Sequence, residues 1–349
     1  MVGYEIRGAV KSDEEELLRL AGHLNTVNLP NDRPHIQRLL EHSEKSFRGE
    51  LPEKRRKYVF LIRDVESGEA LGTSMIVAQL GRRDAPYIYL DVSTEEKYSG
   101  ALDRHFHHTV LRIGFSYDGP TEIGGLVVAP VHRRSPERLG LSISYVRFLF
   151  IAMHRSLFQN EILAELLPPL EPDGTSHLWE AFGRRFTGMS YAEADLLSSE
   201  NKSFVRDLFP SGNVYASLLS EDARAVIGKV GAQTRGVEKM LRRIGFRYAK
   251  RIDPFDGGPH FVAETDEISL VQGSARRKLR VGRPKEPNCR ALLARDLPGA
   301  PYFRALSAPA ALLEDEVLAE AEAAERLGVG QGEELWVLPL RSGSMRPPQ

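Results

Sequence analysis

Cysteine is almost absent from this sequence of 349 residues, in which Cys289 is the only one. A single cysteine excludes an intrachain disulfide and a zinc site built from several thiolates. It favours a reducing, cytoplasmic compartment, where disulfides are rare. The sequence also lacks a run of about 18 apolar residues, which a membrane-spanning helix requires. Its first 20 residues carry an early acidic cluster and no continuous apolar stretch, so we expect no secretory signal.

An excess of charge of either sign is also missing. The formal net charge is −1, from 47 basic and 48 acidic residues. Such a balance gives no general attraction to nucleic acid or to an anionic membrane, and it leaves small molecules as the expected partners. The chain is 42% hydrophobic and 27% charged, which is typical of a soluble globular enzyme. Its length allows one large domain or two ordinary ones.

Apolar and amphipathic segments alternate along the first hundred residues. The pattern predicts a strand at residues 4–10 and a helix that begins with Ser12 as its N-cap. A loop and an amphipathic helix follow at 26–51. Two apolar runs on either side of residues 66–69 predict a hairpin, and residues 85–93 predict a further strand.

Three histidines lie close together in the segment at residues 104–115, which the pattern predicts to be helical. A metal site is one interpretation of such a cluster. However, the spacing i, i+2, i+3 does not place all three on one face of a helix. We therefore favour a solvated helix face for these residues, which are His105, His107 and His108.

The segment at residues 121–170 is the most informative part of the chain. A strand at 121–130 is interrupted by two adjacent glycines and is followed by a basic turn. The next segment, 139–157, is apolar nearly all round, which is typical of a buried helix. Another apolar strand at 160–170 ends in two prolines. A strand, a helix and a second strand in this order predict a βαβ crossover with two parallel strands.

The turn of this unit has the chemistry of a coenzyme A site. The N-terminus of a helix offers free N–H groups to a diphosphate. A glycine-interrupted strand can accept an extended, amide-bearing ligand such as pantetheine as an additional strand. A plain βαβ unit with a basic solvent-facing loop remains the alternative. The basic or permissive residues around the helix start are His132, Arg133, Arg134, Arg138 and Gly140.

The composition changes after about residue 272. Residues 274–289 are rich in basic side chains and lack apolar periodicity, so we interpret them as a linker or an exposed turn. An alanine- and glutamate-rich helix is predicted at 312–328, between strand-like ends. We therefore expect one domain at residues 1–272, with a linker and a small C-terminal α/β module at 273–349.

The strand, basic turn and helix resemble the acyl-CoA site of the GCN5-related N-acetyltransferase superfamily, with Arg133 or Arg134, Gly140 and Ser142 as a loose match to its turn. Over residues 4–270 the sequence more specifically resembles the arginine N-succinyltransferase family. Matching segments occur in the same order along the chain. They include GELPEKRRKYVFLIRDVESGEALGTSMI, EIGGLVVAPVHR, LSISYVRFLFIAMHR, GTSHLWEAFGRRFTGMSYAEAD, YASLLSEDARAVIGKVGAQT and LRRIGFRYAKRIDPFDGGP.

This resemblance implies a mixed α/β (α+β) fold with a central sheet flanked by helices. It also implies the transfer of succinyl from succinyl-CoA to the α-amine of arginine, in arginine catabolism. Acyl-CoA would be a co-substrate, with no permanently bound cofactor and no metal. The expected partners are these small molecules, with no nucleic acid and no membrane. A homo-oligomer or a hetero-oligomer with a paralogous subunit is possible.

The sequence departs from the family pattern at several positions. Gly231 stands where the family has its proton-donor histidine. Residues 165–168 lack an arginine that the family has there. The pair Tyr89-Leu90 stands where the family has a tyrosine followed by an arginine. Arginines are natural partners for the carboxylate of a succinyl group, so their loss affects the choice of acyl chain. Two alternatives stay open: an acyltransferase with a different amine or acyl-CoA, and an inactive CoA-binding subunit or sensor.

The candidate site residues follow from the motifs and from the resemblance. Glu122 could deprotonate the attacking amine, or simply end a strand in solvent. His260 is a local candidate for the acid that the family histidine would supply. Asp253 and Asp256 could meet a cationic substrate or serve the turn before two glycines. The resemblance adds Asn28 and Asp32 near the substrate. The acyl-CoA contacts are expected at Leu126, Val127, Val128, Arg133, Arg134, Arg138, Gly140 and Ser142.

Overall fold

The structure is a computed structural model that describes residues 3–23, 29–82, 85–171, 173–200, 202–284 and 289–340. The chain forms two compact units, each assembled from separate segments. Unit 1 comprises Met1–Ala78, Ile123–Phe158 and Asp266–Gln349. Unit 2 comprises Gln79–Glu122 and Gln159–Thr265. Within the described ranges, no helix is both long and apolar enough to cross a membrane.

The N-terminal strands of unit 1 form the sheet that carries the glycine-interrupted strand. β1 (Tyr4–Gly8), β2 (Lys57–Asp64) and β3 (Ala70–Val77) are antiparallel neighbours, and β6 (Thr121–Val128) follows β3 in the strand order. The predicted strand at residues 4–10 and the predicted hairpin are thus confirmed. β2 is buried over most of its length, which explains its nearly continuous apolar sequence.

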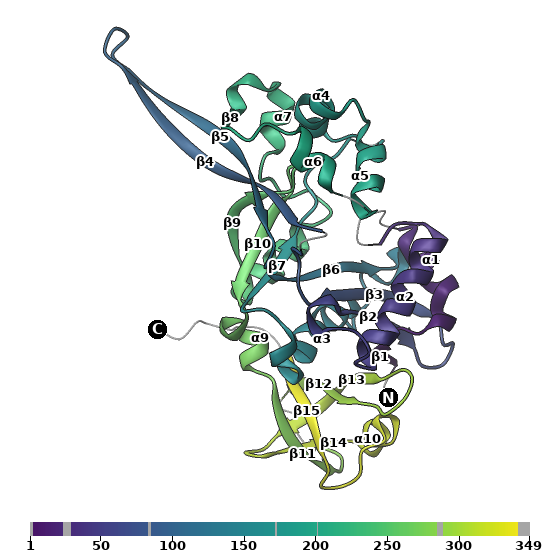
Figure 1. The fold of residues 1–349 in the computed structure, drawn as a ribbon. Helices are drawn as coiled ribbons and strands as arrows, with labels where there is room; N and C mark the ends of the chain where they lie inside the picture. The colour runs from purple at the N-terminus through teal and green to yellow at the C-terminus, as the bar shows by residue number, and fades with distance from the viewer. Residues whose placement is uncertain are drawn as a thin grey trace. The chain divides into compact units, whose positions relative to one another are not determined.

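Helices cover both faces of this sheet (Figure 1). Val59 and Leu61 of β2 pack in one cluster with residues of α1 (Glu14–Ala21) and α2 (Arg33–Phe47). Successive side chains of a strand point to opposite faces. Tyr58 and Phe60 therefore meet the other layer, where their ring centroids lie 4.8 Å and 5.2 Å from that of Phe150. Phe150 belongs to α3 (Leu139–Met153), the helix that the sequence predicts to be buried.

The first helix does not begin at Ser12, contrary to the prediction. Lys11–Asp13 form a 3₁₀ turn, and α1 starts at Glu14. The Asp13 carboxylate determines this start, because it accepts a hydrogen bond from the Val10 N–H at 2.8 Å and pairs with Arg7. A buried ion pair thus takes precedence over the N-cap preference of serine.

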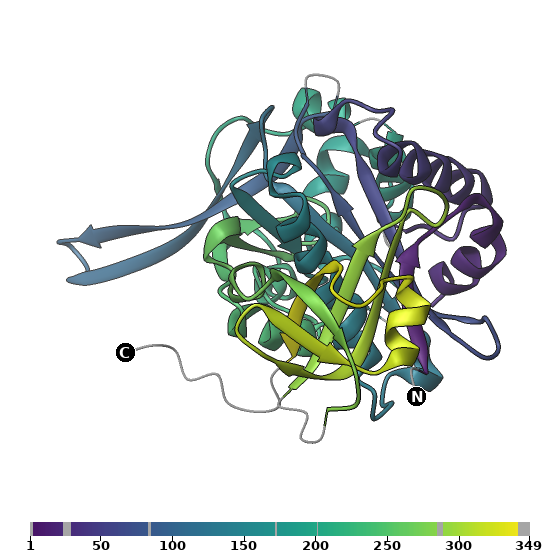
Figure 2. The same ribbon diagram turned by 90° about the horizontal axis from the view of Figure 1, so that it is seen from below.

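The C-terminal strands of unit 1 close into a small barrel (Figure 2). Their pairings run β12–β15–β11–β14–β13 and return from β13 to β12, and β13 also pairs with β1. A short helix, α10 (Ala321–Leu327), contributes to the barrel core. That residues 273–349 form a module of their own stays a prediction. The strands are β11 (Ala275–Val281), β12 (Cys289–Asp296), β13 (Phe303–Leu312), β14 (Glu316–Ala319) and β15 (Glu334–Leu340).

Two predictions about this region are wrong. The expected linker at 274–289 contains strand β11, in which outward-facing basic residues alternate with inward-facing ones such as Leu279. The basic side chains conceal the period-2 pattern. The expected helix at 312–328 is divided, because Val317 and Ala319 point into the barrel from β14 before α10 begins.

Unit 2 contains a second group of strands, in the order β7–β10–β9–β4–β5–β8. β6 and β7 are parallel, which confirms the predicted crossover. Helices α4 to α8 lie in the second segment of the unit, Gln159–Thr265. The strands are β4 (Tyr87–Ser99), β5 (Arg104–Ser116), β7 (Glu161–Glu165), β8 (Val214–Tyr215), β9 (Arg247–Ile252) and β10 (Pro259–Glu264). The helices are α4 (Arg184–Thr187), α5 (Tyr191–Glu200), α6 (Ser203–Leu208), α7 (Glu221–Val226) and α8 (Arg235–Arg243).

The histidine-rich segment at 104–115 is not helical. It forms β5, which pairs with β4 over the whole of a long hairpin (Figure 1). Pairing with the neighbouring strand takes precedence over local helix propensity here. His105 Nδ1 lies 2.6 Å from Glu96 Oε1, whereas His108 Nδ1 lies 3.0 Å from the Ser217 hydroxyl. The histidines therefore engage separate partners.

Candidate functional site

The middle of β6 departs from regular strand geometry. Gly125 has a φ of +55°, and a β-carbon at this position would lie 2.8 Å from the Cε atom of Met75. Only glycine fits such a backbone without strain. In the described chain, the pairing of β6 with β7 covers Thr121 and Glu122 and does not continue into the rest of β6. Leu126 and Val128 are half-buried beyond this point, and Val127 is buried.

The start of α3 keeps its N–H groups free of side-chain caps. Arg138 occupies the N-cap position with a φ of 54°, and no side-chain cap hydrogen bond is formed there. A β-carbon on Gly140 would meet its nearest atom, Val128 Cγ2, only at 3.8 Å. Arg133 and Arg134 are exposed, and Arg133 Nε donates to the Val128 carbonyl at 3.0 Å. This helix terminus has the dipole and the free donors that suit an anion.

Ser142 has a different environment from the other expected acyl-CoA residues. Its side chain is buried, and its hydroxyl lies 3.2 Å from the hydroxyl of Tyr4. Tyr4 in turn donates to the carbonyl of Glu137, in the turn before α3. Ser142 therefore connects α3 to β1 and, through Tyr4, helps to hold the turn before α3 in place.

A polar cluster occupies one end of the β7–β10 ladder in unit 2. Glu165, the last residue of β7, is the register partner of His260 on β10. His260 Nε2 lies 3.5 Å from Glu165 Oε1, and His260 Nδ1 lies 2.6 Å from the hydroxyl of Tyr87. His260 has no exposed surface, whereas a third of the Glu165 side chain is exposed. Glu165 is thus the solvent-facing member of this group.

Two aspartates of the β9–β10 turn belong to the same cluster. Asp253 Oδ1 accepts the N–H groups of Phe255 and Asp256 at 2.7 Å and 3.3 Å. Asp256 Oδ1 accepts the N–H of Gly258 at 2.7 Å. Both carboxylates therefore have the turn-forming role that turn chemistry predicts. Asp253 also has a carboxylate oxygen within 4.8 Å of the ligand atoms of Glu165 and His260.

The proximity of these acids changes their protonation. Desolvation of the Glu165 carboxyl raises its pKa well above its usual value although a third of the side chain is exposed, and the negative charges of Glu122, Asp253 and Asp256 raise it further, against the charge of Lys202. Burial and the charge of Asp253 likewise raise the pKa of Asp256. Carboxylates that share a site cannot all be ionised at low cost. The cluster is therefore suited to hold a proton or a cation.

The imidazole of His260 has the opposite shift. Burial, together with the positive charges of Arg251 and Lys202, lowers the pKa of His260 to about 3. The ring is accordingly neutral at physiological pH. Burial also raises the pKa of Tyr87, so its phenol stays protonated.

Asp195, on α5, gives a test of these electrostatics. Burial and the charge of Asp253 raise the pKa of Asp195 to about 6. Because the pKa of Asp195 is higher in the folded than in the unfolded protein, its protonated form stabilises the fold at a pH below the unfolded-state pKa. This stabilisation is lost as the pH rises through about 6. We expect Asp195→Asn to raise the free energy of unfolding by roughly 1–3 kcal/mol at pH 8 and to change it little at pH 4.

Urea unfolding of the Asp195→Asn variant and the wild type at the two pH values measures this difference. Asp207→Asn is the control, because this side chain is exposed in an ion pair with Arg206. An equal effect of Asp195→Asn at both pH values would contradict the predicted titration.

Several sequence predictions lie outside these two groups. Asn28 lies outside the described residues. Asp32 is exposed and caps α2, where its side chain accepts the His35 N–H at 2.8 Å. The sequence pattern identified neither Glu165 nor Asp195 as a site residue. The one available signal for Glu165 was its place in residues 165–168, where the sequence departs from the family pattern.

The position of the missing family histidine is closely packed. The Gly231 N–H donates to the Leu167 carbonyl at 2.8 Å. A β-carbon on Gly231 would lie 2.6 Å from the carbonyl oxygen of Pro168. A side chain here would need the backbone of residues 167–168 to move. The departures at 231 and at 165–168 are therefore physically coupled.

Comparison with known proteins gives consistent matches. The family model described as arginine N-succinyltransferase beta subunit matches residues 4–270. The chain is 30% identical over 346 residues to arginine N-succinyltransferase from Yersinia pestis, covering 96% of this chain and 97% of that protein. It is 32% identical over 350 residues to arginine N-succinyltransferase subunit beta from Pseudomonas aeruginosa, covering 96% and 98%.

A solved structure also matches along the chain. It is the arginine/ornithine succinyltransferase subunit AI from Pseudomonas aeruginosa, with a TM-score of 0.84 and 27% identity. The match covers 98% of this chain and 100% of that one. This similarity confirms the predicted mixed α/β fold, in which helices flank a large sheet.

Proposed function

This chain belongs to the arginine N-succinyltransferase family, and from that premise we propose that it transfers succinyl from succinyl-CoA to the α-amine of arginine. The observation that supports this most is the similarity over nearly the full length of relatives with that name. The proposal includes a role in arginine catabolism, a cytoplasmic location and no permanently bound organic cofactor. Small molecules are the proposed substrates, and an oligomer with itself or with a paralogous subunit is the proposed assembly.

Unit 1 is proposed to bind acyl-CoA. The irregular part of β6 offers backbone groups at Leu126, Val127 and Val128 to the amides of pantetheine, as an additional strand would. The start of α3 offers free N–H groups beside Arg138 and Gly140 to the diphosphate. The exposed side chains of Arg133 and Arg134 supply positive charge to the same turn, and Ser142 supports it through Tyr4.

Unit 2 is proposed to supply acid–base chemistry and to attract the amine. Glu122 is buried and is the second residue of β6, the strand that also carries Leu126. It is proposed to accept the proton of the attacking ammonium. Asp253 and Asp256 are proposed to attract a cationic substrate, whose charge would favour their ionised forms against the raised pKa values of both carboxyl groups. Because His260 is entirely buried, we propose that it takes part in proton transfer only through Glu165, its exposed neighbour, whose Oε1 atom lies 3.5 Å from His260 Nε2.

An inactive CoA-binding subunit is the second candidate function. The packing around Gly231 supports it, because the family histidine cannot be accommodated there without a backbone shift. The relative from Pseudomonas aeruginosa is named as a subunit, which is compatible with a supporting role in an assembly. An acyltransferase with another amine or acyl-CoA is a variant of the first candidate.

Release of free thiol from succinyl-CoA and acetyl-CoA, with arginine, ornithine and lysine as acceptors, tests the proposal. We expect turnover with succinyl-CoA and arginine to exceed every other combination. Calorimetry with CoA is measured on the same preparation. Binding of CoA without turnover would support the inactive subunit, and preferred turnover with acetyl-CoA would reject the succinyl assignment.

A further inference from the structure

We propose that Glu165, Asp253 and His260 form a binding site for one divalent transition-metal ion, such as Zn²⁺. One ligand atom of each side chain lies within 4.8 Å of the others. Glu165 comes from the end of β7, Asp253 from the β9–β10 turn and His260 from β10. The proposal uses only unit 2 and does not rest on the proposed enzymatic function.

The orientation of His260 is the observation that points to a ligand. Its Nε2 atom is buried and has no hydrogen-bond partner within the described structure. Its Nδ1 atom is 2.6 Å from the Tyr87 hydroxyl, and this contact orients the ring. An imidazole held by a hydrogen bond at one nitrogen and directed at carboxylates with the other is the usual arrangement of a metal-binding histidine.

The distance between the ligand atoms of His260 and Glu165 also favours an ion over a shared proton. A hydrogen bond between nitrogen and oxygen normally spans about 2.7–3.2 Å. Two ligands bound to Zn²⁺ at about 2.1 Å, separated by a tetrahedral angle, lie about 3.4 Å apart. The distance from His260 Nε2 to Glu165 Oε1 is 3.5 Å. An ion between these atoms would therefore need little movement of either side chain.

Charge and access are compatible with such an ion. Two carboxylates and a neutral imidazole balance the charge of a dication, and Glu122 and Asp256 add negative charge nearby. The imidazole ligand favours zinc and its neighbours over magnesium or calcium, which prefer oxygen. Glu165 is one-third exposed, so the ion can enter from solvent. Three protein ligands leave a coordination position open for water or a small molecule.

The test uses the full-length chain, freed of metal with EDTA and titrated with Zn²⁺ by calorimetry. We expect one ion per chain, and visible ligand-field absorption when Co²⁺ replaces Zn²⁺. His260→Gln and Asp253→Asn should abolish the stoichiometric binding. Tyr87→Phe should weaken binding about 10–100-fold, because it removes the group that orients His260. Glu264→Gln, an exposed change on the same strand as His260, should leave binding unchanged.

Circular dichroism and thermal unfolding of each variant show whether it is folded. Failure of the wild type to bind Zn²⁺ or Co²⁺ stoichiometrically would overturn the proposal, as would unchanged binding in folded His260→Gln and Asp253→Asn. Thiol release by the EDTA-treated protein separates this result from the proposed function. Turnover without metal binding would support the proposed succinyl transfer and reject the metal site. Metal binding without turnover would support the metal site and reject the proposed succinyl transfer.

Discussion

Replacing Glu122 with Gln is expected to lower kcat for succinyl transfer about 10²–10⁴-fold, the usual contribution of a general base. Glutamine keeps the shape of the buried side chain but cannot accept the proton of the amine. The acyl-CoA residues lie further along β6 and in α3, so the affinity for CoA should change little. Steady-state thiol release and calorimetry with CoA measure the two effects separately.

Glu264→Gln is the matched control for this substitution, because Glu264 is an exposed strand residue of the same unit. Glu122→Gln also removes a charge that raises the pKa of Glu165, so the pKa of Glu165 should fall. A limb of the pH–rate profile that depends on protonated Glu165 should then move to lower pH. Wild-type kcat in the Glu122→Gln variant would show that another group accepts the proton.

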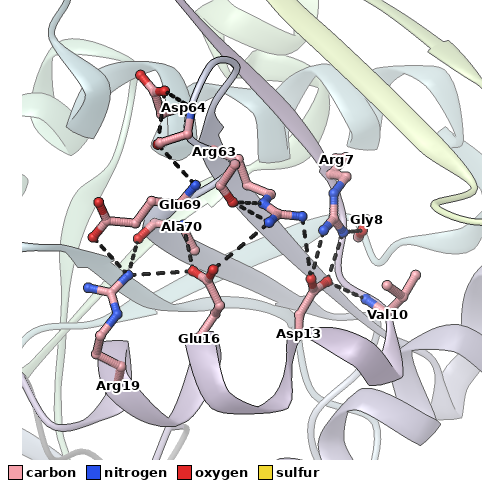
Figure 3. A network of polar contacts seen from close by, with 12 residues as sticks. Arg7, Gly8, Val10, Asp13, Glu16, Arg19, Arg63, Asp64, Glu69 and Ala70 are labelled. Atoms are coloured by element: carbon pink, nitrogen blue, oxygen red, sulfur yellow. Dashed lines mark hydrogen bonds and ion pairs between the residues drawn. The ribbon is translucent and has the colours of Figure 1, made fainter.

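Replacing Asp13 with Ala is expected to lower the free energy of unfolding by about 3–5 kcal/mol, as for other buried ion pairs that lose one partner. Asp13 and Arg7 form two hydrogen bonds, of 2.7 Å and 2.8 Å, and their side chains are only 4% and 7% exposed (Figure 3). The variant leaves the Arg7 guanidinium buried without its carboxylate. It also removes the acceptor of the Val10 N–H before α1.

Urea unfolding measures this loss, and two further variants define its origin. Glu50→Ala removes a partner of Arg48 at 2.8 Å, but these side chains are 50% and 40% exposed, so the change should stay within about 1 kcal/mol. Combining Arg7→Met with Asp13→Leu should cost less than Asp13→Ala alone, because no unpaired charge remains. A loss below about 1 kcal/mol for Asp13→Ala would contradict the buried-pair account.

The sequence predicted those elements whose signal is local. α3 is apolar nearly all round and the hairpin of β2 and β3 has a polar turn, so both are evident from a short window. β5 and β11 were missed because charged and histidine side chains line their outer faces. Only pairing with β4, and with β14 and β15, shows that these segments are strands.

The same distinction applies to the candidate site. The two glycines of β6, the basic turn and Glu122 lie in one short stretch, and the sequence identified them together. The polar cluster joins Glu165 of β7 to Asp253, Asp256 and His260, which lie far from it in the chain, and the sequence named these three residues but not Glu165. Its geometry depends on the β7–β10 register, which places His260 opposite Glu165.

By itself, the sequence determined the family, the order of the main elements and the chemistry available for holding an acyl-CoA. These depend on composition and on short-range periodicity, which each segment carries in its own residues. Only the tertiary structure decided which carboxylates share a site, which histidine is buried and why residue 231 has no room for a side chain. Those properties arise from burial and from distances between segments remote in the chain, and no local pattern encodes either.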